Sequence, residues 1–98
     1  MEKDLFWVEV LRLRPTAVSI RRDKVDDVLA WFNPEDLSGF APLAVGTDGE
    51  LNLYLLDGHA RAFALWATGV DLAPVYIARK DLTPADAKAA DISTLELV

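Results

Sequence analysis

The sequence predicts a compact α+β domain with a small mixed sheet and three or four short helices. Short runs of Val, Ile, Leu and aromatic residues alternate along the chain with segments of helical periodicity. Glycine and proline punctuate these segments at close intervals. The chain has 98 residues and an apolar share of 52%, which suits one hydrophobic core. We therefore expect a single domain over residues 1–98.

The first half of the chain contains two predicted strands and a helix. Residues 5–13 are rich in Val, Leu and aromatic residues and predict a strand, which Pro15 ends. Residues 18–20 are a short extended continuation. An apolar spacing of three and four residues then predicts a helix that starts at Asp23 and ends before Asn33-Pro34. We expect Asp23 to be its N-cap.

The second half predicts a hairpin, a buried helix and further short elements. Residues 42–45 and 51–56 flank an Asp-Gly pair, which is typical of a β-hairpin. The helix that follows is apolar nearly all round and stops at Gly69. Residues 75–78 predict a strand, and Thr83-Pro84 predicts another helix start. Residues 94–98 form either a last edge strand or a frayed end.

Composition excludes several classes of function. The chain has no cysteine, so it has neither disulfides nor thiolate chemistry, and its one histidine argues against a structural zinc site. The formal charge of −6 disfavours a nucleic-acid partner, although four arginines lie close together in residues 12–22. No apolar run is long enough to span a membrane, and the N-terminus does not resemble a signal peptide. We expect a cytoplasmic protein.

The most informative stretch is Asp57-Gly58-His59-Ala60-Arg61, which joins a strand to a helix. A helix start leaves its first N–H groups unpaired and is electropositive, and glycine lets an anion approach closely. Gly58, His59, Ala60 and Arg61 are therefore candidate phosphate-binding residues, with Arg61 neutralising charge. His59 is also a candidate acid or base, and Asp57 a candidate catalytic or Mg²⁺-binding group. An ordinary capped turn is the alternative that this spacing leaves open.

This turn resembles the Gly-x-x-Arg phosphate turn of the ParB/sulfiredoxin-like superfamily. The order of the proline segment, first helix, hairpin and glycine-to-proline exit is also similar, over about residues 11–77. Sulfiredoxins have a catalytic cysteine after this glycine, where this chain has His59. ParB partition proteins have an acidic residue and further arginines in the turn, where this chain has His59 and Ala60. The Asp-Gly start is most similar to the turn of the free-serine kinases.

The resemblance implies a nucleotide- or phosphate-binding domain and suggests a small-molecule kinase of the free-serine type. Its partner would be a nucleotide or phosphorylated small molecule, with Mg²⁺ and ATP, ADP or CTP as cofactors. The kinases place a catalytic glutamate where this chain has Arg22, with Asp23 beside it as the third candidate catalytic residue. The alternative is a non-catalytic interaction module that retains the fold. Arg22 favours that alternative, and homodimerisation would accompany it.

Overall fold

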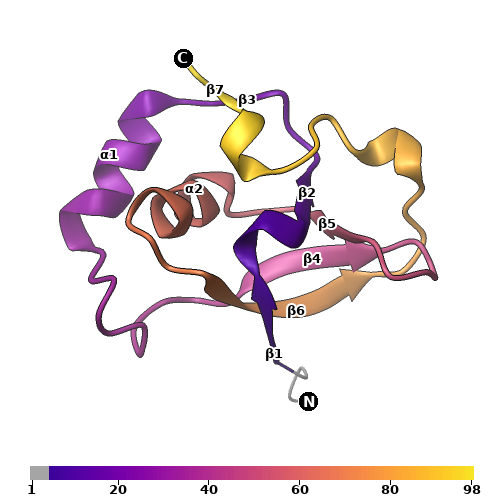
Figure 1. The fold of residues 1–98 in the computed structure, drawn as a ribbon, viewed down its shortest axis with the longest axis horizontal. Helices are drawn as coiled ribbons and strands as arrows, with labels where there is room; N and C mark the ends of the chain where they lie inside the picture. The colour runs from indigo at the N-terminus through magenta and orange to yellow at the C-terminus, as the bar shows by residue number, and fades with distance from the viewer. Residues whose placement is uncertain (1–4) are drawn as a thin grey trace.

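A five-stranded mixed sheet runs through the protein in a computed structural model that describes residues 5–98 (Figure 1). The strand order is β1-β6-β4-β5-β2. The strands are β1 (Phe6–Glu9), β2 (Leu13–Pro15), β4 (Leu43–Thr47), β5 (Leu53–Leu55) and β6 (Leu72–Arg79). β6 pairs antiparallel with β1 and parallel with β4, whereas β5 pairs antiparallel with β4 and parallel with β2. The prediction of a small mixed sheet is confirmed.

The single strand predicted over residues 5–13 is wrong, because the chain turns in the middle of it. A 3-10 turn, η1 (Val10–Arg12), separates β1 from β2. β1 and β2 then occupy opposite edges of the sheet. Three residues can join opposite edges only if the sheet curls on itself. Val10 and Leu13 are both buried, so the apolar pattern continues through the turn and hides it from sequence inspection.

The predicted hairpin is present as β4 and β5, and its loop is organised by one carboxylate. Gly49 has a φ of 85°, in the left-handed region. Asp48 Oδ2 accepts hydrogen bonds from the Asn52 side-chain amide at 2.9 Å and from the Tyr54 hydroxyl at 2.8 Å. Asp48 Oδ1 accepts from the Glu50 N–H at 3.0 Å. These bonds lower the pKa of Asp48.

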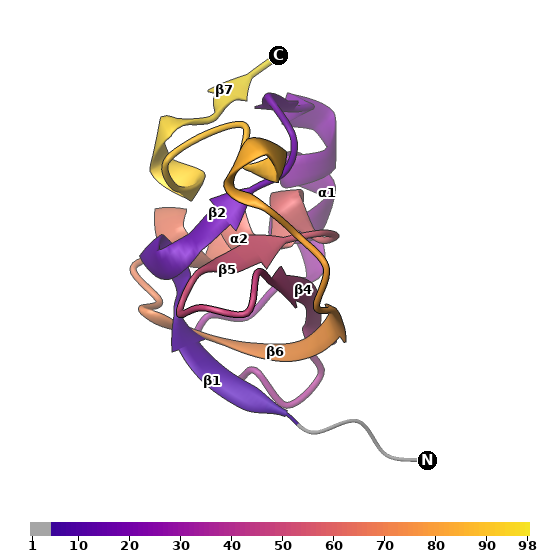
Figure 2. The same ribbon diagram turned by 90° about the vertical axis from the view of Figure 1, so that its right-hand side faces the viewer.

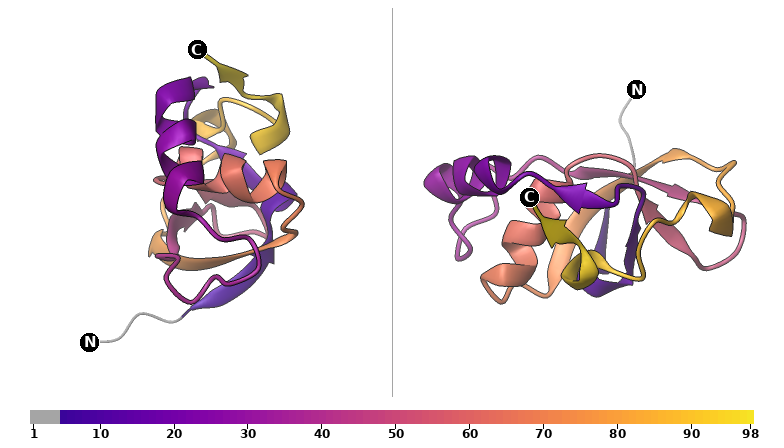
Figure 3. Two further views of the ribbon diagram at one scale, coloured as in Figure 1. Left: turned by 90° about the vertical axis from the view of Figure 1, so that its left-hand side faces the viewer. Right: turned by 90° about the horizontal axis from the view of Figure 1, so that it is seen from above.

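Residues 5–98 contain two α-helices, α1 (Arg22–Trp31) and α2 (His59–Ala67), where three or four were predicted. The helix predicted at Thr83 is only a 3-10 turn, η2 (Pro84–Asp86), in which Asp86 Oδ2 accepts the Thr83 N–H at 2.7 Å. After this turn the chain is extended at Ala87, and the Lys88 N–H donates to the Pro15 carbonyl at 2.8 Å. Figures 1 and 3 show α1 and α2 side by side, away from the tip of the β4–β5 hairpin.

The start of α1 also differs from the prediction. The helix begins at Arg22 and its N-cap is Arg21, so Asp23 lies in the first turn and is not the cap. The Asp23 carboxylate instead pairs with the Arg21 guanidinium at 2.6 Å. The Arg22 N–H donates to the Val98 carbonyl at 2.8 Å. The C-terminal end of the chain, whose structure the sequence left open, therefore provides the hydrogen-bond acceptor for the first N–H group of α1.

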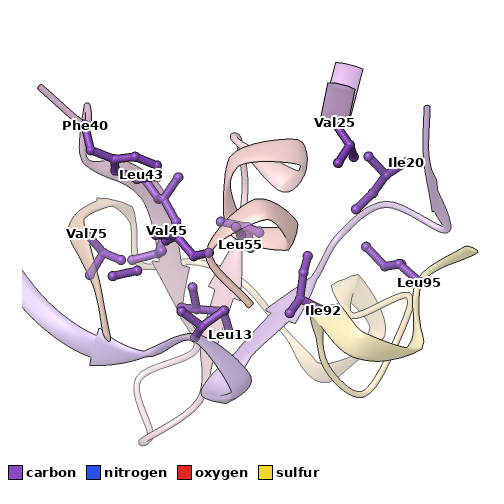
Figure 4. Packing of buried hydrophobic residues seen from close by; sticks show 14 residues of the cluster. Leu13, Ile20, Val25, Phe40, Leu43, Val45, Leu55, Val75, Ile92 and Leu95 are labelled. Atoms are coloured by element: carbon purple, nitrogen blue, oxygen red, sulfur yellow. The ribbon is translucent and has the colours of Figure 1, made fainter. Parts of the chain in front are cut away.

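The C-terminal segment completes the core. A third 3-10 turn, η3 (Ile92–Thr94), precedes β7 (Glu96–Leu97), which pairs parallel with β3 (Ser19–Ile20). Of the two alternatives that the sequence left open for residues 94–98, the structure thus has the strand. Figure 4 shows the buried cluster extending from Val75 and Val45 on the sheet to Ile92 and Leu95. Figure 2 shows β1 and β7 at opposite ends of the molecule. Within residues 5–98 no helix is long and apolar enough to cross a membrane.

The aromatic and apolar side chains are less uniformly buried than the sequence predicts. α2 buries Ala62, Ala64 and Leu65, but Trp66 is 38% exposed. The end of α2 does follow the prediction. Gly69 has a φ of 81°, the Gly69 N–H donates to the Trp66 carbonyl, and the Val70 N–H donates to the Leu65 carbonyl. Trp7 and Trp31 are each 56% exposed.

Candidate functional site

The chain enters α2 through a tight turn at Gly58. Gly58 has a φ of 85° and a ψ of 30°, which is left-handed backbone and strained for residues with a Cβ. A Cβ at Gly58 would lie 2.6 Å from a Leu43 methyl carbon and 2.8 Å from an Arg61 guanidinium nitrogen. Asp57 Oδ1 accepts the Gly58 N–H at 2.8 Å. The backbone therefore favours glycine here, and a Cβ would also force the Leu43 and Arg61 side chains to shift.

The first three amides of α2 point out of the helix start. The first intrahelical bond runs from the Ala62 N–H to the Gly58 carbonyl, at 2.9 Å. The N–H groups of His59, Ala60 and Arg61 precede it, and no side chain in the described part of the chain caps them. Partial positive charge collects at such a helix end. Unpaired amides at a helix start suit an anion, and these are the residues for which the sequence predicts phosphate binding.

Arg61 lies beside the same turn. Its Nη1 donates to the Ala41 carbonyl at 2.7 Å, and its guanidinium lies 5.7 Å from the centre of the Phe40 ring. The closeness of the guanidinium to the Gly58 position shows that the side chain folds back toward the helix start. One donor is thus used to hold Arg61 in place, and the guanidinium charge stays next to the exposed amides.

His59 connects the turn to the segment after β2. Its Nε2 accepts the Thr16 backbone N–H at 3.2 Å, and the Thr16 hydroxyl donates to the Leu55 carbonyl at 2.8 Å. Burial lowers the pKa of His59, and the nearby charge of Asp57 opposes that shift only in part. With Nε2 accepting, the neutral ring carries its proton on Nδ1. Nε2 is therefore engaged in structure, and Nδ1–H is the ring donor that remains.

A pocket of about 310 Å³ brings the turn together with the start of α1. Its lining combines the α2 turn with the β3–α1 segment: Ala17, Ser19, Ile20, Arg21, Lys24, Asp57, Gly58, His59 and Ala60. Lys24 adds positive charge beside the α2 amides, whereas the charge of Arg21 is offset by its pair with Asp23. Asp23 and Arg61 do not line this pocket, and Asp23 is neutralised by Arg21. The predicted Asp57, Gly58, His59 and Ala60 thus meet in one place.

Sequence reasoning did not assign Arg21 and Lys24 to the site. Arg21 belongs to the basic segment of residues 12–22, and Lys24 follows it by three residues, on the same face of a helix. That spacing was the only sequence feature that could have pointed to these two residues. It shows a role in the site only once the structure places β3 and the start of α1 beside the α2 turn.

The carboxylates of the site do not form a ready metal centre. Among residues 5–98, no three His, Asp or Glu side chains converge in a way that could hold a metal ion. Asp57 is exposed, and one of its oxygens is bound to the Gly58 amide. A single carboxylate fits Mg²⁺ when ligand phosphates and water complete the shell. Asp57 would therefore hold Mg²⁺ only together with a phosphorylated ligand.

The fold is shared with solved structures, although sequence comparison finds no relative. No protein-family profile and no curated protein sequence matches the chain. The fold is similar to protein Atu1540 from Agrobacterium tumefaciens, with a TM-score of 0.72 and 17% identity, over 96% of this chain and 62% of that one. It is also similar to a free serine kinase variant in complex with ADP, with a TM-score of 0.60 and 22% identity.

The match to the kinase covers 79% of this chain and 32% of the kinase chain. The same kinase in complex with AMP gives a TM-score of 0.60 and 21% identity. This chain thus spans less than two thirds of each of these proteins. At such identities the likeness establishes a common fold: a compact mixed α/β domain that also occurs in a nucleotide-bound kinase.

Proposed function

We propose that this protein binds a nucleotide, or a related phosphorylated small molecule, with a phosphate group at the start of α2. The amides of His59, Ala60 and Arg61 would receive the phosphate oxygens, and the Arg61 guanidinium would neutralise their charge. Lys24, which also lines the pocket, would attract further phosphate charge.

The observation that carries this proposal is the uncapped helix start at Gly58 with the Arg61 guanidinium folded back against it. The complexes of the structurally similar free serine kinase with ADP and AMP support a nucleotide as the ligand. The domain is acidic overall, so local positive charge has to select the ligand. A single small anion suits this arrangement better than a nucleic-acid backbone does.

A finer form of the proposal is phosphoryl transfer from ATP or ADP to the hydroxyl of a small molecule. The hydroxyl oxygen would form the new bond to phosphorus, the shortened nucleotide would leave, and a carboxylate would accept the hydroxyl proton. Asp57 is the best candidate for that carboxylate, because Asp23 is paired with Arg21 and His59 Nε2 is occupied. Mg²⁺ would neutralise phosphate charge beside Asp57 when bound.

Binding without transfer is the second candidate function. The Arg21–Asp23 ion pair favours binding without transfer. The pair occupies the carboxylate of Asp23, which lies nearest to the position of the kinase glutamate and would otherwise be available as a base. The two candidates differ in one measurement. Phosphorus NMR of the protein with ATP or ADP, Mg²⁺ and free serine should show a new phosphomonoester signal if transfer occurs, and no such signal if the protein only binds.

Isothermal titration with ATP, ADP and CTP, each with and without Mg²⁺, tests the binding proposal. We expect saturable binding of at least one nucleotide, and a loss of about 10- to 100-fold in affinity for Arg61→Ala, the range of a charge-assisted hydrogen bond. Arg12→Ala is the matched control, because Arg12 is an exposed arginine on η1. The absence of heat with every nucleotide, or equal losses in the two variants, would contradict the proposal.

A further inference from the structure

A second cavity lies at the opposite end of α2 from the phosphate site. It has a volume of about 420 Å³, within the range of small-molecule pockets. Its lining comes from the end of β1, from η1, from the last turn of α2 and from the start of β6: Glu9, Val10, Leu11, Trp66, Val70, Asp71 and Leu72. The pocket is therefore built by four elements.

The apolar part of this cavity is unusually accessible. Leu11, Trp66 and Leu72 are 51%, 38% and 46% exposed, and all three line the same hollow. Large apolar side chains that gather at one concave place, and not singly over a surface, are typical of binding sites. The Trp66 ring offers the strongest aromatic partner for a cation.

The two charged residues that line the cavity, Glu9 and Asp71, are both acidic. They come from neighbouring segments: Glu9 pairs with Leu72 in the β1–β6 register, and the Val10 N–H donates to the Asp71 carbonyl at 2.8 Å. The last turn of α2 contains no basic residue, and its carbonyl end is electronegative. Within residues 5–98, no Lys or Arg side chain lines this cavity.

We infer that this cavity binds an organic cation, an ammonium or guanidinium group carried on an apolar stem. The stem would lie against Leu11 and Leu72, and the cation over the Trp66 ring, attracted by the acidic Glu9 and Asp71 in the same lining. A neutral apolar ligand would gain no attraction from the two carboxylates, and an anion would be repelled by them. The complementarity of charge and the apolar floor together select this class of ligand.

NMR titration of the labelled protein with n-butylguanidinium tests the inference, with n-butylurea as the neutral isostere. We expect saturable shifts of the Trp66 indole and the Val70–Leu72 amides with the cation, weaker binding at high salt, and binding of the urea that is weaker or absent. Glu9→Gln and Asp71→Asn should each weaken binding about two- to five-fold. Glu96→Gln, an exposed position on β7, is the control and should change nothing.

Two further probes sharpen the result. Trp66→Leu keeps an apolar side chain but removes the ring, and should weaken cation binding while n-butylurea binding stays the same. The blocked dipeptide acetyl-Arg-Leu-amide separates two sources of the cation: tighter binding than n-butylguanidinium assigns a peptide ligand, and equal binding assigns a free amine or guanidine. Equal affinity for the urea and the cation, shifts located at His59 instead, or no effect of Glu9→Gln and Asp71→Asn would each overturn the inference.

Discussion

His59 illustrates how one side chain can differ in role from what its type suggests. An imidazole beside a phosphate site predicts an acid or base, whereas here Nε2 accepts the Thr16 N–H and ties two segments together. The His59–Thr16 bond spans 43 residues of sequence, so no local pattern could reveal it. The sequence singled out His59, and the tertiary contact defined which of its nitrogens is engaged.

The lowered pKa of His59 predicts a specific pH dependence of stability. The group binds its proton less readily in the folded state than in the unfolded state, whose value is 6.5. Its contribution to the free energy of unfolding is therefore complete above pH 6.5 and is lost as the pH falls through the lower folded value. Urea unfolding at about pH 7.5 and about pH 5.5, above the range where most carboxylates titrate, should show this loss.

His59→Gln is the matched control, because a glutamine carbonyl can accept the Thr16 N–H and does not titrate. Its stability should stay level between the two pH values. NMR titration of the imidazole is unambiguous, since His59 is the one histidine of the chain. A folded pKa at or above 6.5, or an equal slope in the glutamine variant, would show that this account of His59 is wrong.

Among the helices, strands and turns, the connection from β5 to α2 is the one that the sequence predicted best. The Asp-Gly pair, the helix start at His59 and the Gly69 stop were all predicted, because they depend on local backbone chemistry. The division of residues 5–13 into β1 and β2 was not predicted. It depends on pairing with β6 and β5, which lie far along the chain.

Gly58 and Gly49 provide a direct comparison for this connection. Both have a φ of 85°, but a Cβ at Gly49 meets nothing within 4 Å, whereas one at Gly58 meets Leu43 and Arg61. Gly49→Ala should lower the free energy of unfolding by about 1–2 kcal/mol, for the left-handed backbone alone. Gly58→Ala should cost about 1–3 kcal/mol more, because the side chain also crowds its neighbours. Equal losses in chemical denaturation would contradict the close packing at the α2 start.

At the scale of the whole molecule, the C-terminal segment is part of the core and not an appendage. Ile92 is fully buried, and the Val98 backbone bonds to both Ile20 and Arg22. The same segment therefore holds β3 and the α1 start, which form one wall of the pocket that contains Arg21 and Lys24. The stability of the domain and the shape of the candidate site are linked through it.

Ile92→Ala tests this link. We expect a loss of about 2–5 kcal/mol in the free energy of unfolding, the usual cost of removing a large buried aliphatic side chain. Val18→Ala should stay within about 0.5 kcal/mol, because Val18 is 70% exposed. Thermal unfolding of Ile92→Ala should remain a single transition at lower temperature. A separate early transition, or no loss at all, would mean that the C-terminal segment does not belong to the core.

Much of this protein is already determined by sequence, and the reason is that turns and helix ends are local. Gly49, Gly58 and Gly69 adopt left-handed backbone where the chain reverses, begins a helix or ends one. The residues next to each glycine are enough to predict these turns. Only the tertiary structure decided which strands pair, that Arg21 and not Asp23 precedes α1, and that Arg21 and Lys24 face the α2 start. These features depend on contacts between segments tens of residues apart, where many arrangements satisfy the same apolar pattern and packing selects one.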